Sequence, residues 1–187
     1  AATEVLGTRP HATQLRPLLS ALHQAGVVDA VQVTGNRGPD DHLIHTLRIA
    51  VRNHLQLDGA FAQVQSWKLK GLEPDLTLAI AQGVRSPEAA DFLLQHWNRV
   101  KGDREAIIQH IATVAPAGRM GELTALVEKS WPADIDRQAE MFRAAANGLH
   151  KRGLPLGEAM NVWGGRLSAR LLAAADQSSP WMNVPLP

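Results

Sequence analysis

The 187-residue sequence contains no cysteine. A chain without thiols can form no disulfide, no thiolate metal site and no cysteine nucleophile. This absence excludes a whole group of catalytic and metal-binding chemistries. It also means that cysteine usage gives no information about the compartment in which the protein works.

The sequence also lacks an excess of either charge, and it lacks long apolar runs. Nineteen Lys and Arg residues stand against eighteen Asp and Glu residues, which gives a net charge of +1. So balanced a chain provides no strong field to attract nucleic acid or an anionic membrane, and we expect neither as a partner. No apolar stretch approaches the ~20 residues of a membrane-spanning helix, so we expect a soluble protein without a membrane span.

The sequence motifs of common enzymes are missing as well. The chain has no glycine-rich phosphate loop and no serine nucleophile elbow. Neighbouring carboxylates, Asp40-Asp41 and Asp134 with Asp136, fall at predicted helix starts, where capping explains them. Gly164-Gly165 lies inside a predicted helix, where it permits close packing or a kink. We therefore predict no catalytic residue, no cofactor and no metal site, and favour a binding protein over an enzyme.

What the sequence does contain is apolar residues at helical spacing. The clearest case is Ser86 to Val100, where an N-cap serine and a proline precede one apolar stripe that includes Phe92 and Trp97. Eight further segments repeat this pattern. They are Leu15 to Leu22 stopped by Gly26, Leu43 to Leu55 starting near Pro39-Asp40-Asp41, a helix capped by Asp58 with Phe61, Val64 and Trp67, Pro74 to Gln82, a helix capped by Asp103, Met120 to Val127, a helix from Asp134 to Gly153, and Leu156 to Leu171.

Nine one-sided helices with short loops predict an all-α fold of antiparallel neighbours. Paired stripes recur about every 40 residues, the spacing of HEAT and armadillo units, so we predict a HEAT-like α-solenoid. An irregular orthogonal helical bundle is the alternative. Val27 to Arg37 is interpreted as a loop.

The predicted helical-repeat domain covers residues 1–175, and residues 176–187 form a linker-like tail with three prolines. The start Ala1-Ala2-Thr3-Glu4, without an initiator methionine, leads us to expect a processed product or an excised segment. Because Trp181 to Leu186 is apolar, we expect this part of the tail to dock, with Trp181 as its anchor.

Two stretches are similar to a known group of proteins. One runs from Pro39-Asp40-Asp41-His42-Leu43 into Leu47 to Leu55, and the other is Ala79 to Leu94. Both resemble the HEAT-like helical region of large secreted multidomain proteins of planctomycetes and their relatives, in which a dehydrogenase-like β-propeller and a c-type cytochrome module flank helical repeats. Ser179-Pro180-Trp181 looks like the junction to a following β-sandwich.

The resemblance extends over residues 39 to 181 and rests on packing motifs. It implies a scaffold between redox or carbohydrate-active modules, outside the cytoplasm, and it carries over no catalytic residue. The chain has no Cys-x-x-Cys-His motif, so it cannot itself hold a covalently attached haem.

Four residues are candidates for a binding surface: His45, Arg48, Arg52 and Trp181. Arg48 and Arg52 stand at i and i+4, so both can reach one carboxylate or phosphate. The simpler interpretation pairs them with Asp or Glu of a neighbouring helix. Asp41 with His42 and His45 is a weak metal motif, because no third ligand is nearby and capping explains the aspartate.

The remaining aromatic and histidine positions favour packing. Trp67, Trp97 and Trp163 lie on apolar stripes and are predicted to be core residues, while Trp131 covers a helix end. His96 is predicted to be a core histidine with one satisfied nitrogen.

The hypothesis that follows is a non-catalytic scaffold that binds other domains of a parent protein or separate proteins. A HEAT-like nucleic-acid enzyme of the DNA glycosylase type is the first alternative, because such enzymes use basic grooves with an acidic residue and a tryptophan beside the damaged base. A small enzyme in an irregular helical bundle is the second.

Overall fold

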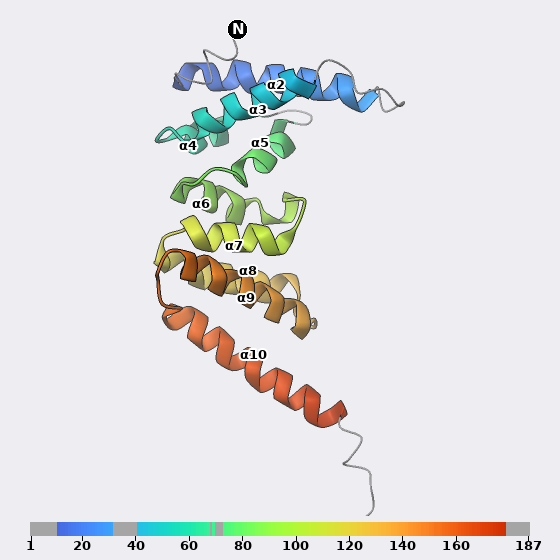
Figure 1. Ribbon diagram of the computed structural model, residues 1–187, viewed down its shortest axis with the longest axis vertical. Helices are drawn as coiled ribbons and strands as arrows, with labels where there is room; N and C mark the ends of the chain where they lie inside the picture. Colours follow the sequence, from blue (N-terminus) through green and yellow to red (C-terminus); the bar gives the residue numbers. More distant parts are fainter. Residues whose placement is uncertain (1–10, 32–40, 68, 70–72, 179–187) are drawn as a thin grey trace, which may run out of the picture. The chain divides into compact units, whose positions relative to one another are not determined.

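The computed structural model describes residues 11–31, 41–67, 69 and 73–178, and every regular element in this part of the chain is helical (Figure 1). The all-α prediction is confirmed, since no strand occurs among these residues. The chain divides into two compact units, residues 1–102 and 103–187, which we describe one at a time.

The first unit contains five α-helices and two short 3-10 helices in its described part. These are η1 Ala12–Gln14, α2 Leu15–Val31, α3 Asp41–Leu55, α4 Ala60–Ser66, α5 Glu73–Ala81, α6 Pro87–Gln95 and η2 Trp97–Arg99. α2 packs along α3, α5 contacts both of them, and α6 contacts α4 and α5. The apolar stripe of each helix fills the space between them, with Leu19, Val51 and Leu93 buried at its centre.

Local signals predicted most of these helices correctly. Ser86 is the N-cap of α6, and its Oγ accepts a hydrogen bond from the amide of Ala89 at 3.2 Å. α3 begins at Asp41, as expected from the capping residues there. Leu43, expected on the inner face of α3, is instead 43% exposed in the first turn of that helix.

Three helix boundaries differ from the prediction. α2 continues through Gly26 to Val31, so the first part of the predicted loop is helical; one glycine costs only about 1 kcal/mol inside a helix. The rest of that loop, residues 32–37, lies outside the described residues. Asp58 does not cap α4: Gly59, with φ of 74°, occupies the N-cap position, and no side chain caps that end.

The third difference is the helix predicted over Ser86 to Val100, which stops at Gln95. His96 leaves the helical region, with φ of −104° and ψ of 20°, and the chain continues as the 3-10 turn η2. The amide of Arg99 bonds the carbonyl of His96 at 2.9 Å, a tighter i to i+3 contact. This turn buries Trp97 to 5% exposure and carries Arg99 toward α5.

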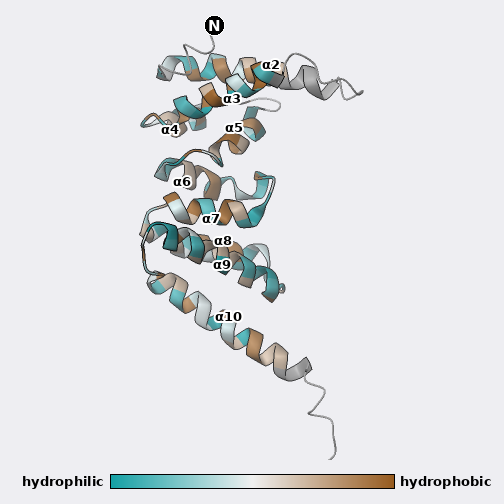
Figure 2. Cartoon of the chain, viewed as in Figure 1, coloured by the Kyte–Doolittle hydropathy of each residue, from teal (hydrophilic) through white to brown (hydrophobic). Residues whose placement is uncertain are grey.

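The second unit contains four α-helices and one 3-10 helix in its described part. These are α7 Arg104–Val114, η3 Ala117–Arg119, α8 Met120–Ser130, α9 Ile135–Lys151 and α10 Gly157–Ser178. α7 packs along α9, and α10 contacts α8 and α9. Figure 2 shows α9 as largely hydrophilic with apolar residues interspersed, as expected for a helix that buries one face.

Both predicted aspartate caps of this unit are confirmed. Asp103 accepts from the amides of Glu105 and Ala106 at 2.9 and 3.3 Å, and Asp134 accepts from the amide of Arg137 at 2.8 Å. α10 extends to Ser178, and residues 179–187, including Trp181, lie outside the described residues.

Tryptophan and glycine positions explain the packing of the second unit. Trp163 on α10 is fully buried, as predicted, and meets the ring of Phe142 edge to face at 5.2 Å. Gly164 permits the approach of Phe142, because an added Cβ would lie 3.0 Å from its Cζ. An even closer approach occurs at Gly148, where α9 lies against α7.

No helix in the described ranges is both long enough and apolar enough to cross a membrane.

Candidate binding sites in the first unit

A depression of about 250 Å³ lies between α3 and α5 of the first unit, and we call it the arginine hollow. Its lining residues are His45, Arg48, Ile49, Arg52, Ala79, Ile80 and Gly83. Three of the four predicted binding residues, His45, Arg48 and Arg52, therefore line one site. The fourth, Trp181, falls outside the described residues.

The helix spacing explains how these side chains gather. His45, Arg48 and Arg52 follow one another at i, i+3 and i+7 along α3, so they share a face of that helix. All three are exposed, whereas Ile80 of α5 is buried and forms part of the floor. The hollow thus combines a basic edge with an aliphatic floor.

Neither Arg48 nor Arg52 is neutralised within the described part of the chain. No hydrogen bond or ion pair joins either guanidinium to a described residue, so the expected pairing with Asp or Glu of a neighbouring helix does not occur there. Four other arginines do bind carboxylates: Arg99 with Asp75, Arg119 with Glu122, Arg137 with Glu140 and Arg166 with Glu128. The arginine hollow therefore carries positive charge that these residues leave uncompensated.

The metal motif at the start of α3 gains no support from the geometry. His42 and His45 are both exposed, and Asp41 is the first residue of the helix. Across the described residues, no group of three or more His, Asp and Glu side chains is arranged to hold a metal ion.

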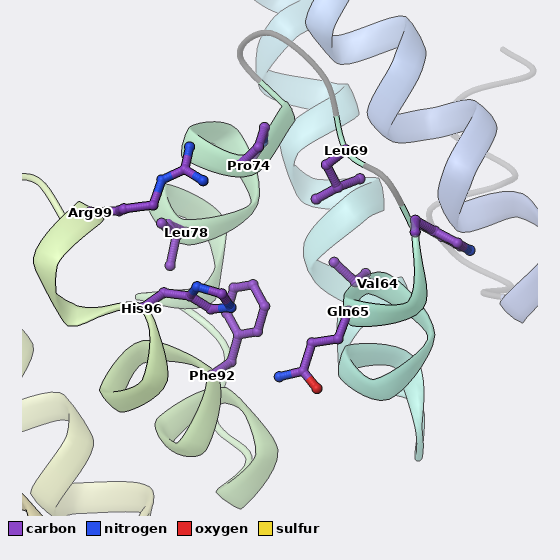
Figure 3. Close-up of a pocket in the computed structure, with 9 residues that line it drawn as sticks. Val64, Gln65, Leu69, Pro74, Leu78, Phe92, His96 and Arg99 are labelled. Atoms are coloured by element: carbon purple, nitrogen blue, oxygen red, sulfur yellow. The ribbon is translucent and has the colours of Figure 1, made fainter.

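A second hollow of about 290 Å³ lies among α4, α5 and α6, and we call it the aromatic cavity (Figure 3). It is lined by Val64, Gln65, Trp67, Leu69, Pro74, Leu78, Phe92, His96 and Arg99. In Figure 3, Val64 and Leu69 face Leu78 and Phe92 across the gap, with Arg99 and His96 at its side.

An aromatic row forms one wall of this cavity. The ring of Phe92 lies 5.1 Å from that of Phe61 and 4.6 Å from that of His96, both tilted. Burial lowers the pKa of His96 below 6.5, and the charge of Arg99 lowers it further, so the ring is neutral at pH 7. His96 was predicted to be a core histidine with one satisfied nitrogen. It is instead only partly buried, and its ring has no hydrogen-bond partner among the described residues.

A three-residue charge cluster adjoins the aromatic cavity. Asp75 Oδ1 accepts from Nη2 of Arg99 at 3.1 Å, and Oδ2 accepts from Nζ of Lys101 at 2.9 Å. The hydrogen bond from Lys101, together with that from Arg99, lowers the pKa of Asp75 below 3.8 although partial burial opposes this shift. Two cations share one carboxylate, so the cluster has a net charge of +1.

No protein-family model, curated protein or solved structure matches this chain. The resemblance to planctomycete multidomain proteins therefore stays a prediction.

The lining of the two hollows limits the chemistry that they can perform. Neither lining includes an aspartate, a glutamate, a serine or a threonine. The two lining histidines, His45 and His96, have no carboxylate beside them in the lining of their own hollow. General acid-base catalysis by paired carboxylates and serine nucleophilic catalysis are thus excluded at these sites.

Most of the aromatic cavity could not be predicted from the sequence. Trp67 was assigned to the core, but its side chain is only partly buried, lines the cavity and lies 5.8 Å below the guanidinium of Arg16. Arg99 and Gln65 were not singled out. The sequence does show two cations, Arg99 and Lys101, on either side of the last apolar residue of the stripe, Val100. It does not show their partner Asp75, which lies 24 residues before Arg99.

The second unit has a hollow of its own, about 270 Å³ in volume, between α7 and α9. It is lined by Asp103, Glu105, Ala106, Gln109, Ala144 and Asn147. Asp103 already accepts two hydrogen bonds as the cap of α7, so structure alone accounts for its position.

Proposed function

We propose that this chain is a non-catalytic, HEAT-like helical scaffold that binds an acidic segment of a protein partner in the arginine hollow. The observation that carries the proposal is the pair Arg48 and Arg52, one turn apart beside a hollow and without a described carboxylate partner. The partner is another domain of a parent protein or a separate protein. The resemblance to secreted multidomain proteins supports an extracytoplasmic location.

The helix contacts support the HEAT-like part of the proposal. One helix in each unit contacts both the next helix and the one after it: α3 contacts α4 and α5, and α8 contacts α9 and α10. Stacked helical hairpins produce this pattern, because each helix touches its own hairpin partner and its counterpart in the adjacent hairpin. Helical repeats of this kind present extended surfaces suited to binding proteins.

The chemistry of the hollow favours an acidic protein segment. Two guanidinium groups one turn apart offer planar pairs of N–H donors that match carboxylates spaced along a helix or an extended chain. Ile49, Ala79 and Ile80 add an aliphatic floor on which an apolar side chain of the same segment can rest. A peptide carries both kinds of group, whereas a nucleic-acid backbone lacks aliphatic side chains.

The DNA glycosylase alternative is less well supported. Such an enzyme needs an acidic residue beside its basic groove, and the lining of the arginine hollow has none. The net charge of +1 also provides little of the long-range attraction on which DNA binding depends.

A synthetic peptide tests the proposal directly. The probe is a capped helical peptide with two glutamates at i and i+4 next to a leucine, and binding is followed by two-dimensional amide NMR. We expect the shifted signals to map to α3 and α5 and the affinity to fall as salt rises. The double variant Arg48→Ala/Arg52→Ala should weaken binding at least tenfold, since charged hydrogen bonds contribute about 1.5–3 kcal/mol each.

The control is Arg85→Ala/Arg143→Ala, which removes the same charge from two exposed arginines outside the hollow. Equal losses in both double variants would show a nonspecific charge effect and overturn the proposal. So would equal affinity for a peptide with glutamine in place of glutamate. Submicromolar binding to duplex DNA near physiological salt, with a slope implying several released counterions, would favour the glycosylase alternative instead.

A further inference from the structure

We propose that the aromatic cavity is a second, independent site, which binds a small arylalkanoic acid: an aromatic ring on a short chain that ends in a carboxylate. Its ring would lie against Phe92 between the apolar walls, and its carboxylate would bind Arg99. This site shares no residue with the arginine hollow, so either proposal can fail without the other.

The walls of the cavity are suited to an apolar body. Val64, Leu78 and Phe92 are buried almost completely in the core, and their surfaces meet the cavity from three different helices. Leu69 is only partly buried and faces them across the gap in Figure 3. Because these walls are already almost completely buried, a ligand that fills the gap gains chiefly by removing its own apolar surface from water.

The row of rings favours an aromatic body over an aliphatic one. Phe61, Phe92 and His96 already lie in successive tilted contacts of 5.1 and 4.6 Å, and the row ends at the cavity. A further ring placed there gains an aromatic contact in addition to the burial of its apolar surface. An alkyl chain gains only from the burial of its apolar surface.

Arg99 provides the polar end of the site. One of its amino groups bonds Asp75, and its other N–H groups have no hydrogen-bond partner among the described residues. Its side chain is 53% exposed, so the guanidinium can form a charged hydrogen bond without any loss of fold contacts. The nearby neutral ring of His96 can donate one further hydrogen bond from a ring nitrogen.

The local charge selects a singly charged anion. Arg99 and Lys101 together exceed Asp75 by one positive charge, which a single carboxylate balances. A phosphate monoester carries close to two negative charges and would meet the repulsion of Asp75 as well. A planar carboxylate also matches the fork of the guanidinium better than a tetrahedral anion would.

The volume limits the size of the ligand. The cavity of about 290 Å³ stands at the lower end of ligand sites. A site of this size suits one ring with a short side chain. A drug-sized molecule would not fit inside it.

The experiment uses 3-phenylpropanoate as the probe and the full chain as the protein. Isothermal titration and amide NMR should give saturable binding, with shifts at Phe92, His96 and Leu69. 3-Phenylpropanamide has nearly the same shape without the charge, and acetate has the charge without the ring. We expect each of them to bind at least tenfold more weakly than the acid.

Two variants distinguish direct contact between Arg99 and the carboxylate of the ligand from the general effect of losing one positive charge. Arg99→Gln and Lys101→Gln remove the same charge from the Asp75 cluster, but only Arg99 lines the cavity. Arg99→Gln should weaken 3-phenylpropanoate binding about tenfold or more, and Lys101→Gln by at most a few fold. Circular dichroism and thermal unfolding check that both variants fold, which their exposed side chains favour.

The proposal is overturned if the acid does not bind at millimolar concentration, or if the amide binds as tightly as the acid. Equal effects of Arg99→Gln and Lys101→Gln would overturn the assignment of the carboxylate to Arg99. Shifts confined to α3 and residues 79–83 would place the acid in the arginine hollow instead, and would also overturn it.

Discussion

Gly148 offers a sharp test of how α7 and α9 pack. A Cβ at this position would lie 2.5 Å from the carbonyl oxygen of Gln109 and 2.7 Å from Cβ of Ala112. Ordinary contacts of a Cβ begin near 3.4 Å, so α7 and α9 would have to separate by almost 1 Å at this point. The obstacle includes backbone, which cannot rotate away as a flexible side chain can.

The expected cost of Gly148→Ala is the difference between two effects. Forcing an extra methyl group into a packed interior costs about 1–3 kcal/mol, and the upper end applies when backbone must move. Replacing glycine by alanine inside a helix returns about 1 kcal/mol. We therefore expect Gly148→Ala to lower the free energy of unfolding by about 2 kcal/mol.

Two other glycines of the same unit serve as controls. Gly165 on α10 has nothing within 4 Å of an added Cβ, so Gly165→Ala should stabilise the protein by about 0.5–1 kcal/mol. Gly164→Ala should fall between the two, because its contact at 3.0 Å is the edge of the Phe142 ring, which can shift slightly. Urea unfolding followed by circular dichroism measures all three. If Gly148→Ala proves as stable as Gly165→Ala, the close packing of α7 on α9 is wrong.

Three further predictions concern single side chains. Trp97→Ala should cost about 3–5 kcal/mol in urea unfolding, because the ring is only 5% exposed; a neutral result would contradict its burial. Arg48→Ala should change stability by less than about 1 kcal/mol, since the side chain is exposed and without a described partner; a larger loss in the same assay would reveal a structural role. Asp75→Asn should cost about 0.5–1 kcal/mol at pH 7. The lowered pKa means that the ion pairs stabilise the fold above pH 3.8 and lose this effect as the pH falls toward the folded-state pKa, so unfolding curves of wild type and variant should converge in acid.

The helices were predictable because their signals are local. Ser86, Asp103 and Asp134 each cap the helix that follows, and each hydrogen bond spans two or three residues. Apolar stripes of period 3.6 extend this information along the helix. Both kinds of signal can be read without knowing what packs against the helix.

The helix predictions were wrong at helix ends that the local sequence pattern does not determine. α2 continues for five residues beyond Gly26, because one glycine costs a helix only about 1 kcal/mol and does not by itself end it. Likewise, the apolar stripe over residues 89–100 fits one helix and equally fits a helix followed by a 3-10 turn. The turn occurs at His96, and it brings Arg99 to Asp75.

The two hollows differ in how far the sequence predicts them. Arg48 and Arg52 were identifiable because their spacing along one helix is visible in the sequence, although the part of α5 beside them was not. The aromatic cavity is assembled from α4, α5, α6 and η2, and its residues looked like core residues because they lie on apolar stripes. Periodicity indicates that Phe92 faces inward, but it does not indicate whether the space opposite is filled. A cavity is a deficit of packing between elements, and only the arrangement of those elements reveals it. For this chain, residues on a perfectly regular stripe are therefore as good candidates for ligand contact as the exposed arginines, and mutational scans should include Trp67, Phe92 and His96 alongside Arg48 and Arg52.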